Sequence, residues 1–224
     1  MNQHQPNPST HTYEEVNQAT VNRTLSQTWK LLSMTLFFAA AMAMLALETG
    51  VFFGPLITLG VYFVLLFVVA RTEDRAIGLF WVFMLTGWLG FSLGPLLSYV
   101  LALNGGSDTV LTALAGTGGI FLLTSAFGRN PERDLSSMGP FLMVGVLVAF
   151  VTGLVNVFFL EIPALQSAIA AAFMLLSSGI IAWYTNVIVR GGETNYIRAT
   201  VMLFVAVYNL FTSLLMLLGF NSDD

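Results

Sequence analysis

The sequence predicts an all-α membrane protein, a bundle of seven transmembrane helices. Of its 224 residues, 56% are hydrophobic and only 9% are charged, and the mean hydropathy is +0.81. A soluble domain carries roughly 25% charged residues, so this chain has too few polar side chains to cover a globular surface. Seven long apolar runs complete the prediction, because a run that crosses a bilayer must satisfy its own backbone hydrogen bonds as a helix.

Each apolar run has at least 17 residues, and at ~1.5 Å per residue such a helix can cross a hydrocarbon layer of about 30 Å. None alternates in the manner of a barrel strand. The predicted spans are residues 31–47, 51–70, 76–103, 109–127, 138–160, 164–189 and 199–220. Together with their short loops they predict one membrane domain over residues 23–224.

Residues 1–22 differ in composition from everything that follows. They are rich in Asn, Gln, Thr and Pro and nearly free of large aliphatic side chains. Such a segment buries too little apolar surface to offset the entropy of ordering it. We therefore expect a disordered tail before the first span.

The basic residues predict the orientation of the chain. All eight precede the first span or lie between spans two and three, four and five, or six and seven: Arg23, Lys30, Arg71, Arg75, Arg129, Arg133, Arg190 and Arg198. Short cytoplasmic loops carry the excess of Lys and Arg. The pattern predicts a cytoplasmic N-terminus and tail and, after seven spans, a periplasmic C-terminus.

Several classes of function are disfavoured. The chain has no Cys and no basic patch of the kind that binds nucleic acid, and no motif points to a metal or another cofactor. The sequence GFSLG, residues 90–94, matches the G-x-S-x-G pattern of serine hydrolases. A serine nucleophile needs a general base, however, and no span contains a His. We therefore predict a protein without enzymatic activity.

The same segment has a simpler interpretation as a helix-packing surface. Gly87, Gly90 and Gly94 are spaced as small residues are where two membrane helices approach closely. Pro95 follows them and predicts a kink in the third span.

Charged residues lie at or near the predicted span edges, so the spans themselves hold only neutral polar side chains. Five of these form a candidate intramembrane polar cluster: Asn156, Tyr184, Thr185, Asn186 and Asn209. Hydrogen bonding between helices is one explanation for such residues, and a polar path for a small ion is the other.

A short polar hairpin, residues 190–198, separates the last two apolar runs. Gly191 and Gly192 fit the end of one helix, and Glu193 or Thr194 fits the start of the next. On a structural interpretation its arginines only set the topology. On a functional one, the hairpin forms a cytoplasmic contact patch, whose candidate residues are Arg190, Glu193, Asn195, Tyr196 and Arg198.

The segments GGETNYIRATV, VYNLF and LLGF, with GWLGFSLGPLLSYV in the third span, resemble the bacterial YccA-like branch of the Bax inhibitor-1 (transmembrane BAX inhibitor motif) family. The resemblance covers roughly residues 25–220. It implies a seven-helix protein of the bacterial inner membrane that binds and modulates the membrane-anchored ATP-dependent protease FtsH. Such a protein is itself a slow substrate of that protease.

The resemblance also implies an alternative function, a pH-sensitive calcium leak that depends on an aspartate pair. In this chain those positions fall at Tyr184 and Ala206, and neither side chain ionises at neutral pH, so neither can exchange a proton or bind a calcium ion as an aspartate does. Calcium is therefore not an expected partner, and the bilayer and the protease are.

Overall fold

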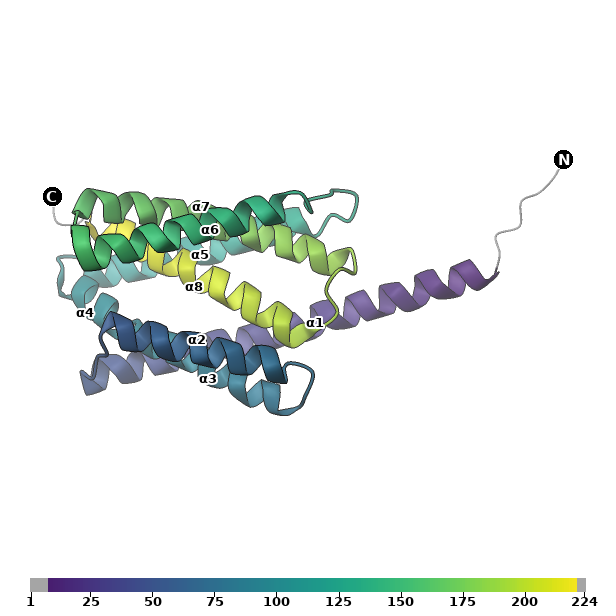
Figure 1. Ribbon diagram of the computed structural model, residues 1–224, viewed down its shortest axis with the longest axis horizontal. Coiled ribbons are helices and arrows are strands. Elements are labelled where there is room, and N and C mark those ends of the chain that lie inside the picture. The colour runs from purple at the N-terminus through teal and green to yellow at the C-terminus, as the bar shows by residue number, and fades with distance from the viewer. Residues whose placement is uncertain (1–7, 221–224) are drawn as a thin grey trace.

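The computed structural model describes the backbone of residues 8–220 and the side chains of residues 18–219, and within that range every regular element is a helix (Figure 1). The elements are α1 (Pro8–Thr49), α2 (Pro55–Thr72), α3 (Ile77–Ser92), α4 (Gly94–Ala102), α5 (Gly106–Gly128), α6 (Met138–Val155), the π-helix η1 (Asn156–Leu160), α7 (Pro163–Val189) and α8 (Tyr196–Phe220).

Seven segments of the described chain are long and apolar enough to cross a membrane, which confirms the predicted fold class. Two of them are composite. The third span, Ile77–Ala102, consists of α3 followed by α4, and the fifth, Met138–Leu160, consists of α6 followed by η1. The five remaining spans are single helices.

The first helix is longer than the sequence predicts. Residues 8–22 are helical and continue into the first span, where we expected a disordered tail over residues 1–22. Adding turns to an existing helix is easy compared with nucleating a new one, and the span supplies the nucleus. Figure 1 shows the N-terminal part of α1 standing out beyond the bundle. Residues 1–7 lie outside the described range.

The predicted kink in the third span is a break between α3 and α4 at Leu93, with Pro95 in the first turn of α4. Gly87, Gly90 and Gly94, around this break, lie against α1. A Cβ on Gly90 would overlap the backbone carbonyl of Ala39, and a Cβ on Gly94 would lie 2.8 Å from the Cβ of Ala46. The absence of side chains therefore allows α1 and α3 to approach this closely.

Gly87 also lies at the contact between α1 and α3. A Cβ there would lie 2.5 Å from Cε1 of Phe38, again on α1. The spacing of Gly87, Gly90 and Gly94 thus places one small-residue face of the third span along the first.

Helix α8 lies at the centre of the bundle. It packs against α7, α1 and α5, and its side chains Leu203, Phe204, Leu210 and Leu215 are almost fully buried. It crosses the molecule obliquely, from α7 to the α2–α3 pair, and is visible between α6 and α2 in Figure 1.

Candidate functional site

The loops that carry the basic residues meet at one end of the bundle, the end from which α1 protrudes (Figure 1). The α7–α8 hairpin contacts α1 and both of the other loops at this end. Thr24 of α1 donates a hydrogen bond to the carbonyl of Thr194 at 3.2 Å, Arg198 forms an ion pair with Glu73 of the α2–α3 loop, and Arg190 pairs with Asp134 of the α5–α6 loop. We call this end the charged end.

Local sequence shapes the hairpin. Gly191 has φ +78°, a left-handed conformation that favours glycine, and its amide bonds the carbonyl of Ile188, so the predicted helix C-cap is confirmed. Helix α8 begins later than we predicted. Its N-cap is Asn195 rather than Glu193 or Thr194, since the Asn195 Oδ1 accepts from the amides of Ile197 and Arg198 at 2.9 and 3.2 Å.

Glu193 is free for another role, because it turns inward and is only 7% exposed. Its Oε2 accepts a hydrogen bond from the Tyr184 hydroxyl at 2.8 Å, and its Oε1 accepts one from the Asn195 amide at 2.8 Å. Arg198 Nη1 lies 3.5 Å from Oε2. A buried carboxylate needs such partners, and here it has two donors and a positive charge.

The α2–α3 loop completes the arrangement. Arg198 bridges two carboxylates, that of Glu193 and that of Glu73. The Asn195 side-chain amide donates to the Glu73 carbonyl at 3.2 Å and to the Asp74 carboxylate at 2.9 Å. We refer to Glu73, Tyr184, Glu193, Asn195 and Arg198 as the hairpin network.

Asn186 of α7, one helical turn before Arg190, forms hydrogen bonds with the α5–α6 loop. It is 1% exposed, and its Nδ2 lies 3.1 Å from the carbonyl oxygens of Gly128, Asn130 and Arg133. Its Oδ1 accepts from the Leu135 amide at 3.3 Å. The two N–H groups of Asn186 are thus shared among three carbonyls, and one side chain contacts four backbone groups at the end of α5 and in the loop after it, more than 50 residues away in sequence.

Arg190 holds the same loop from outside. Its Nη1 donates to the carbonyls of Pro131 and Arg133 at 3.3 Å, and its Nη2 lies 3.2 Å from the Asp134 carboxylate. Hydrogen bonds from Ser136, first its hydroxyl and then its amide, lower the pKa of Asp134, and the charge of Arg190 adds to this. Asp134 therefore remains an anion opposite Arg190.

The predicted contact patch is divided by this geometry. Arg190 and Arg198 keep exposed surface, while Glu193 and Asn195 bond other parts of the chain. Tyr196 is half-buried and packs against the core around Ile197 and Leu85. The outward face of the hairpin thus presents mainly its two arginines.

The five neutral residues of the predicted intramembrane cluster do not form one cluster. Tyr184, Thr185 and Asn186 lie at the charged end of α7, whereas Asn156 lies beside the other end of α7. Asn209 is in the middle of α8. Asn156 bonds Gln166 in the first turn of α7, and the rise from Gln166 to Tyr184 is roughly 27 Å at ~1.5 Å per residue.

Each member of the set has its own environment. Thr185 is fully buried where Gly128 allows close packing of α5 on α7. Asn156 bonds the backbone of Ile162 in both directions and donates to Gln166 Oε1 at 3.1 Å, which holds the turn from η1 into α7. Asn209 lines a cavity between α2 and α6.

Comparison with known proteins shows the family to which the chain belongs. The family model described as "Inhibitor of apoptosis-promoting Bax1" matches residues 21–223. The chain belongs to this family. The membrane-embedded bundle and its hairpin, which carried the resemblance in the sequence, lie within the matched range, so the recognition of the Bax inhibitor-1 family is confirmed.

Similar members of the family are bacterial. The chain is 42% identical to the "Modulator of FtsH protease YccA" of Escherichia coli K12, with 91% of this chain and 92% of that protein covered. In another E. coli strain the matching protein, equally similar, is named an inner membrane protein. A membrane protein of Vibrio cholerae is 38% identical, with 91% and 92% covered. The chain is thus a multi-pass inner-membrane protein of the Bax inhibitor-1 family.

The two positions at which the resemblance placed the family's aspartate pair, Tyr184 and Ala206, lie in one buried hydrophobic cluster. Tyr184 belongs to the hairpin network, and Ala206 is 2% exposed in the core around Phe204 and Leu210. Among the described residues, no three His, Asp or Glu side chains gather in a way that could hold a metal ion.

Sequence reasoning missed several partners of the hairpin. Glu73, Asp134 and Thr24 were not among the candidate residues of the sequence analysis. Their role depends on contacts between segments 56 to 170 residues apart, for which a single sequence carries no local signal.

Proposed function

We propose that this protein binds and modulates the membrane-anchored ATP-dependent protease FtsH, and that it is itself a slow substrate of that protease. The observation that carries the proposal is the similarity, over almost the whole of both chains, to a protein named a modulator of FtsH. In this proposal the protein acts by binding, without catalysis of its own.

The orientation is part of the proposal. We infer that the charged end faces the cytoplasm, because all eight Lys and Arg residues lie in the N-terminal segment or in the loops on that side. The protruding part of α1 then also lies in the cytoplasm (Figure 1), on the side where an ATP-driven protease would grip its substrate.

Two features support slow processing. A helix that extends beyond its bundle has little tertiary support, and isolated helices of about 12–15 residues are marginal in water. The extension is therefore easy to unfold and to pull. Behind it, α1 packs against α3, α4 and α8, and the hairpin network and Asn186 tie the next loops together.

FtsH would begin to degrade such a substrate easily but would extract the packed bundle slowly. The substrate then occupies the protease and restrains its action on other proteins. Arg190 and Arg198 are exposed on the hairpin, so in this proposal a partner on the cytoplasmic side can contact them.

The test is deletion of residues 2–17, which leaves the buried contacts of Val21, Thr24 and Thr28 in place. The matched control replaces the same residues with a Gly/Ser segment of equal length, which restores a flexible handle without the helix. We expect the deletion to stop degradation by FtsH and the replacement to restore it.

Co-purification with the protease is measured on the same three proteins. An unchanged half-life and unchanged co-purification after the deletion would show that the N-terminal extension is not the handle. Failure of the full-length protein to co-purify with FtsH would overturn the proposed function itself.

A further inference from the structure

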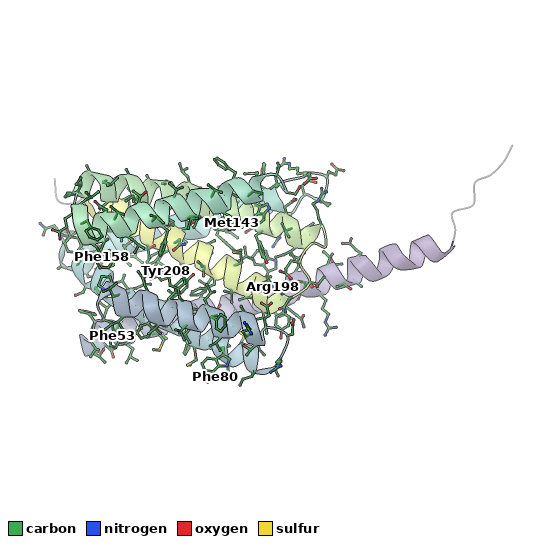
Figure 2. All side chains as sticks on the ribbon, viewed as in Figure 1. Phe53, Phe80, Met143, Phe158, Arg198 and Tyr208 are labelled. Carbon is green, nitrogen blue, oxygen red and sulfur yellow. The ribbon has the colours of Figure 1, made fainter. Side chains whose placement is uncertain are left out.

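A cavity of about 460 Å³ lies in the half of the bundle away from the charged end, between α2 and α6, with α8 as its floor. Phe53, Phe150, Phe158 and Phe173 form much of its wall. Figure 2 shows two of them at this end of the molecule, Phe158 in η1 and Phe53 just before the start of α2. Small-molecule sites are typically about 300–1,000 Å³ and mostly apolar, with a few converging polar groups.

The polar groups of this cavity come from different helices. Gln166 projects from α7, Asn209 and Ser213 from α8, and Ser92 from the end of α3. The Ser92 hydroxyl already bonds the Leu89 carbonyl at 2.7 Å and the Tyr208 hydroxyl at 3.0 Å. Ser92 is therefore part of the frame of the cavity.

The two amides have donor capacity left. Gln166 Oε1 accepts from Asn156, but Gln166 Nε2 has only the Met216 sulfur, at 3.7 Å, and a thioether is a weak acceptor. The Asn209 side chain makes no hydrogen bond to the described part of the chain, although its backbone carbonyl accepts from Thr212. A polar group at membrane depth is costly unless it finds a partner.

Charge is missing from the wall: none of the described residues that line the cavity is acidic or basic. An ion that entered would lose hydration without gaining a counter-charge, which is strongly unfavourable. A neutral molecule with carbonyl or hydroxyl oxygens would instead accept the two amide donors while its apolar part packs against the phenylalanines.

The cavity communicates with the lipid. Helices α2 and α6 meet through the rings of Phe63 and Phe150, whose centroids are 6.0 Å apart. Beyond that contact, Val157 of η1 is 45% exposed and Phe53 is 41% exposed, so the wall between η1 and the start of α2 is open to the side. A ligand would enter from the bilayer.

We propose that this cavity binds an uncharged, membrane-soluble amphiphile whose carbonyl or hydroxyl oxygens accept hydrogen bonds from Asn209 and Gln166. Diacylglycerol is the simplest probe of this class. The inference concerns a ligand of the protein itself and does not rest on the interaction with a protease.

The experiment uses a dioleoylglycerol probe with a photoactivatable diazirine in one acyl chain, added to the full-length protein in phosphatidylcholine vesicles. We expect saturable labelling, competed by unlabelled dioleoylglycerol, of peptides from residues 163–173 and 209–216. A matched probe with a phosphate in place of the free hydroxyl should label these peptides less.

Two variants remove the donors, Asn209→Leu and Gln166→Leu, and each should weaken labelling about fivefold, which corresponds to the loss of about one hydrogen bond. A third, Gly153→Leu, fills the cavity: a Cβ on Gly153 would meet only Ile169 Cγ2, at 3.8 Å. It should reduce labelling without removing any polar group, and it tests the site if a donor variant does not fold.

The control is Thr152→Val, since the Thr152 hydroxyl bonds the Val148 carbonyl of its own helix on the exposed face of α6. Its labelling should equal that of the unmodified protein. Equal labelling in Asn209→Leu, Gly153→Leu and Thr152→Val, or labelling spread over the lipid-facing surface, would overturn the proposal. So would labelling by the phosphate-bearing probe that equals labelling by the neutral one.

Discussion

The Tyr184 hydroxyl donates a 2.8 Å hydrogen bond to Glu193, and both side chains are at most 7% exposed. The two residues belong to α7 and to the hairpin after it, so this bond fixes the direction in which the chain leaves α7. It also explains how a carboxylate is tolerated inside the charged end, since a buried charge requires donors or a counter-charge.

Replacement of Tyr184 by Phe removes that donor and leaves the rest of the hairpin network in place. Hydrogen bonds to charged groups contribute about 1.5–3 kcal/mol, so we expect Tyr184→Phe to lower the stability of the purified protein by that order. Thermal unfolding in detergent measures the change. The control is Tyr62→Phe, because Tyr62 contacts Phe63 through its ring and its hydroxyl makes no hydrogen bond to the described chain. Equal effects of the two substitutions would show that the bond to Glu193 does not matter.

Asn186 offers a sharper test, because Asp has almost the same shape. Asn186→Asp keeps an acceptor for the Leu135 amide but places a carboxylate against the carbonyls of Gly128, Asn130 and Arg133. Each carbonyl that loses its donor costs about 1–3 kcal/mol. We expect Asn186→Asp to be at least as destabilising as Asn186→Ala.

The local consequence is release of the α5–α6 loop. Limited trypsin digestion reports this, because Arg129 and Arg133 are cleavage sites within the loop. Cleavage there should accelerate in both Asn186 variants and remain slow in Thr124→Val, which removes a hydroxyl bonded only within its own helix. A resistant loop in Asn186→Asp would contradict the role assigned to this side chain.

Composition and spacing predicted the parts of this structure that depend on neighbouring residues. The seven apolar runs predicted the seven spans, Gly191 predicted the end of α7, and Pro95 predicted the break in the third span. The helical extension back to Pro8 was missed, because composition describes what a segment would do alone and not when joined to a long helix.

The candidate site required knowledge of distant contacts. Glu193, after two glycines and before a polar stretch, has the local character of an exposed loop residue, yet it is buried because Tyr184 and Arg198 converge on it. Asn156 and Asn209 appeared equivalent to Asn186 in the sequence. Only the fold shows that Asn156 holds a turn, that Asn209 lines a cavity and that Asn186 bonds the α5–α6 loop.

The contact between the first and third spans predicts opposite outcomes for two Gly→Ala substitutions. A methyl group on Gly90 would overlap the Ala39 carbonyl, whereas a methyl group on Gly119 would meet nothing within 4 Å. Overpacking of this kind costs about 1–3 kcal/mol, while Ala is the better helix former by about 1 kcal/mol. Gly90→Ala should therefore destabilise the protein and Gly119→Ala should leave its stability unchanged or slightly raised. Thermal unfolding of both variants checks this, and a neutral Gly90→Ala would place α1 and α3 farther apart.

The proposed orientation predicts which loops face the cytoplasm. The chain contains no Cys, so single cysteines can be introduced without a background, at Glu132 in the α5–α6 loop and at Ser107 in the first turn of α5. Both positions are exposed and lie at opposite ends of the bundle. In intact spheroplasts a membrane-impermeant maleimide should label Ser107→Cys and should label Glu132→Cys only after permeabilisation. The reverse pattern would invert the bundle and place the protruding end of α1 in the periplasm, out of reach of a cytoplasmic protease.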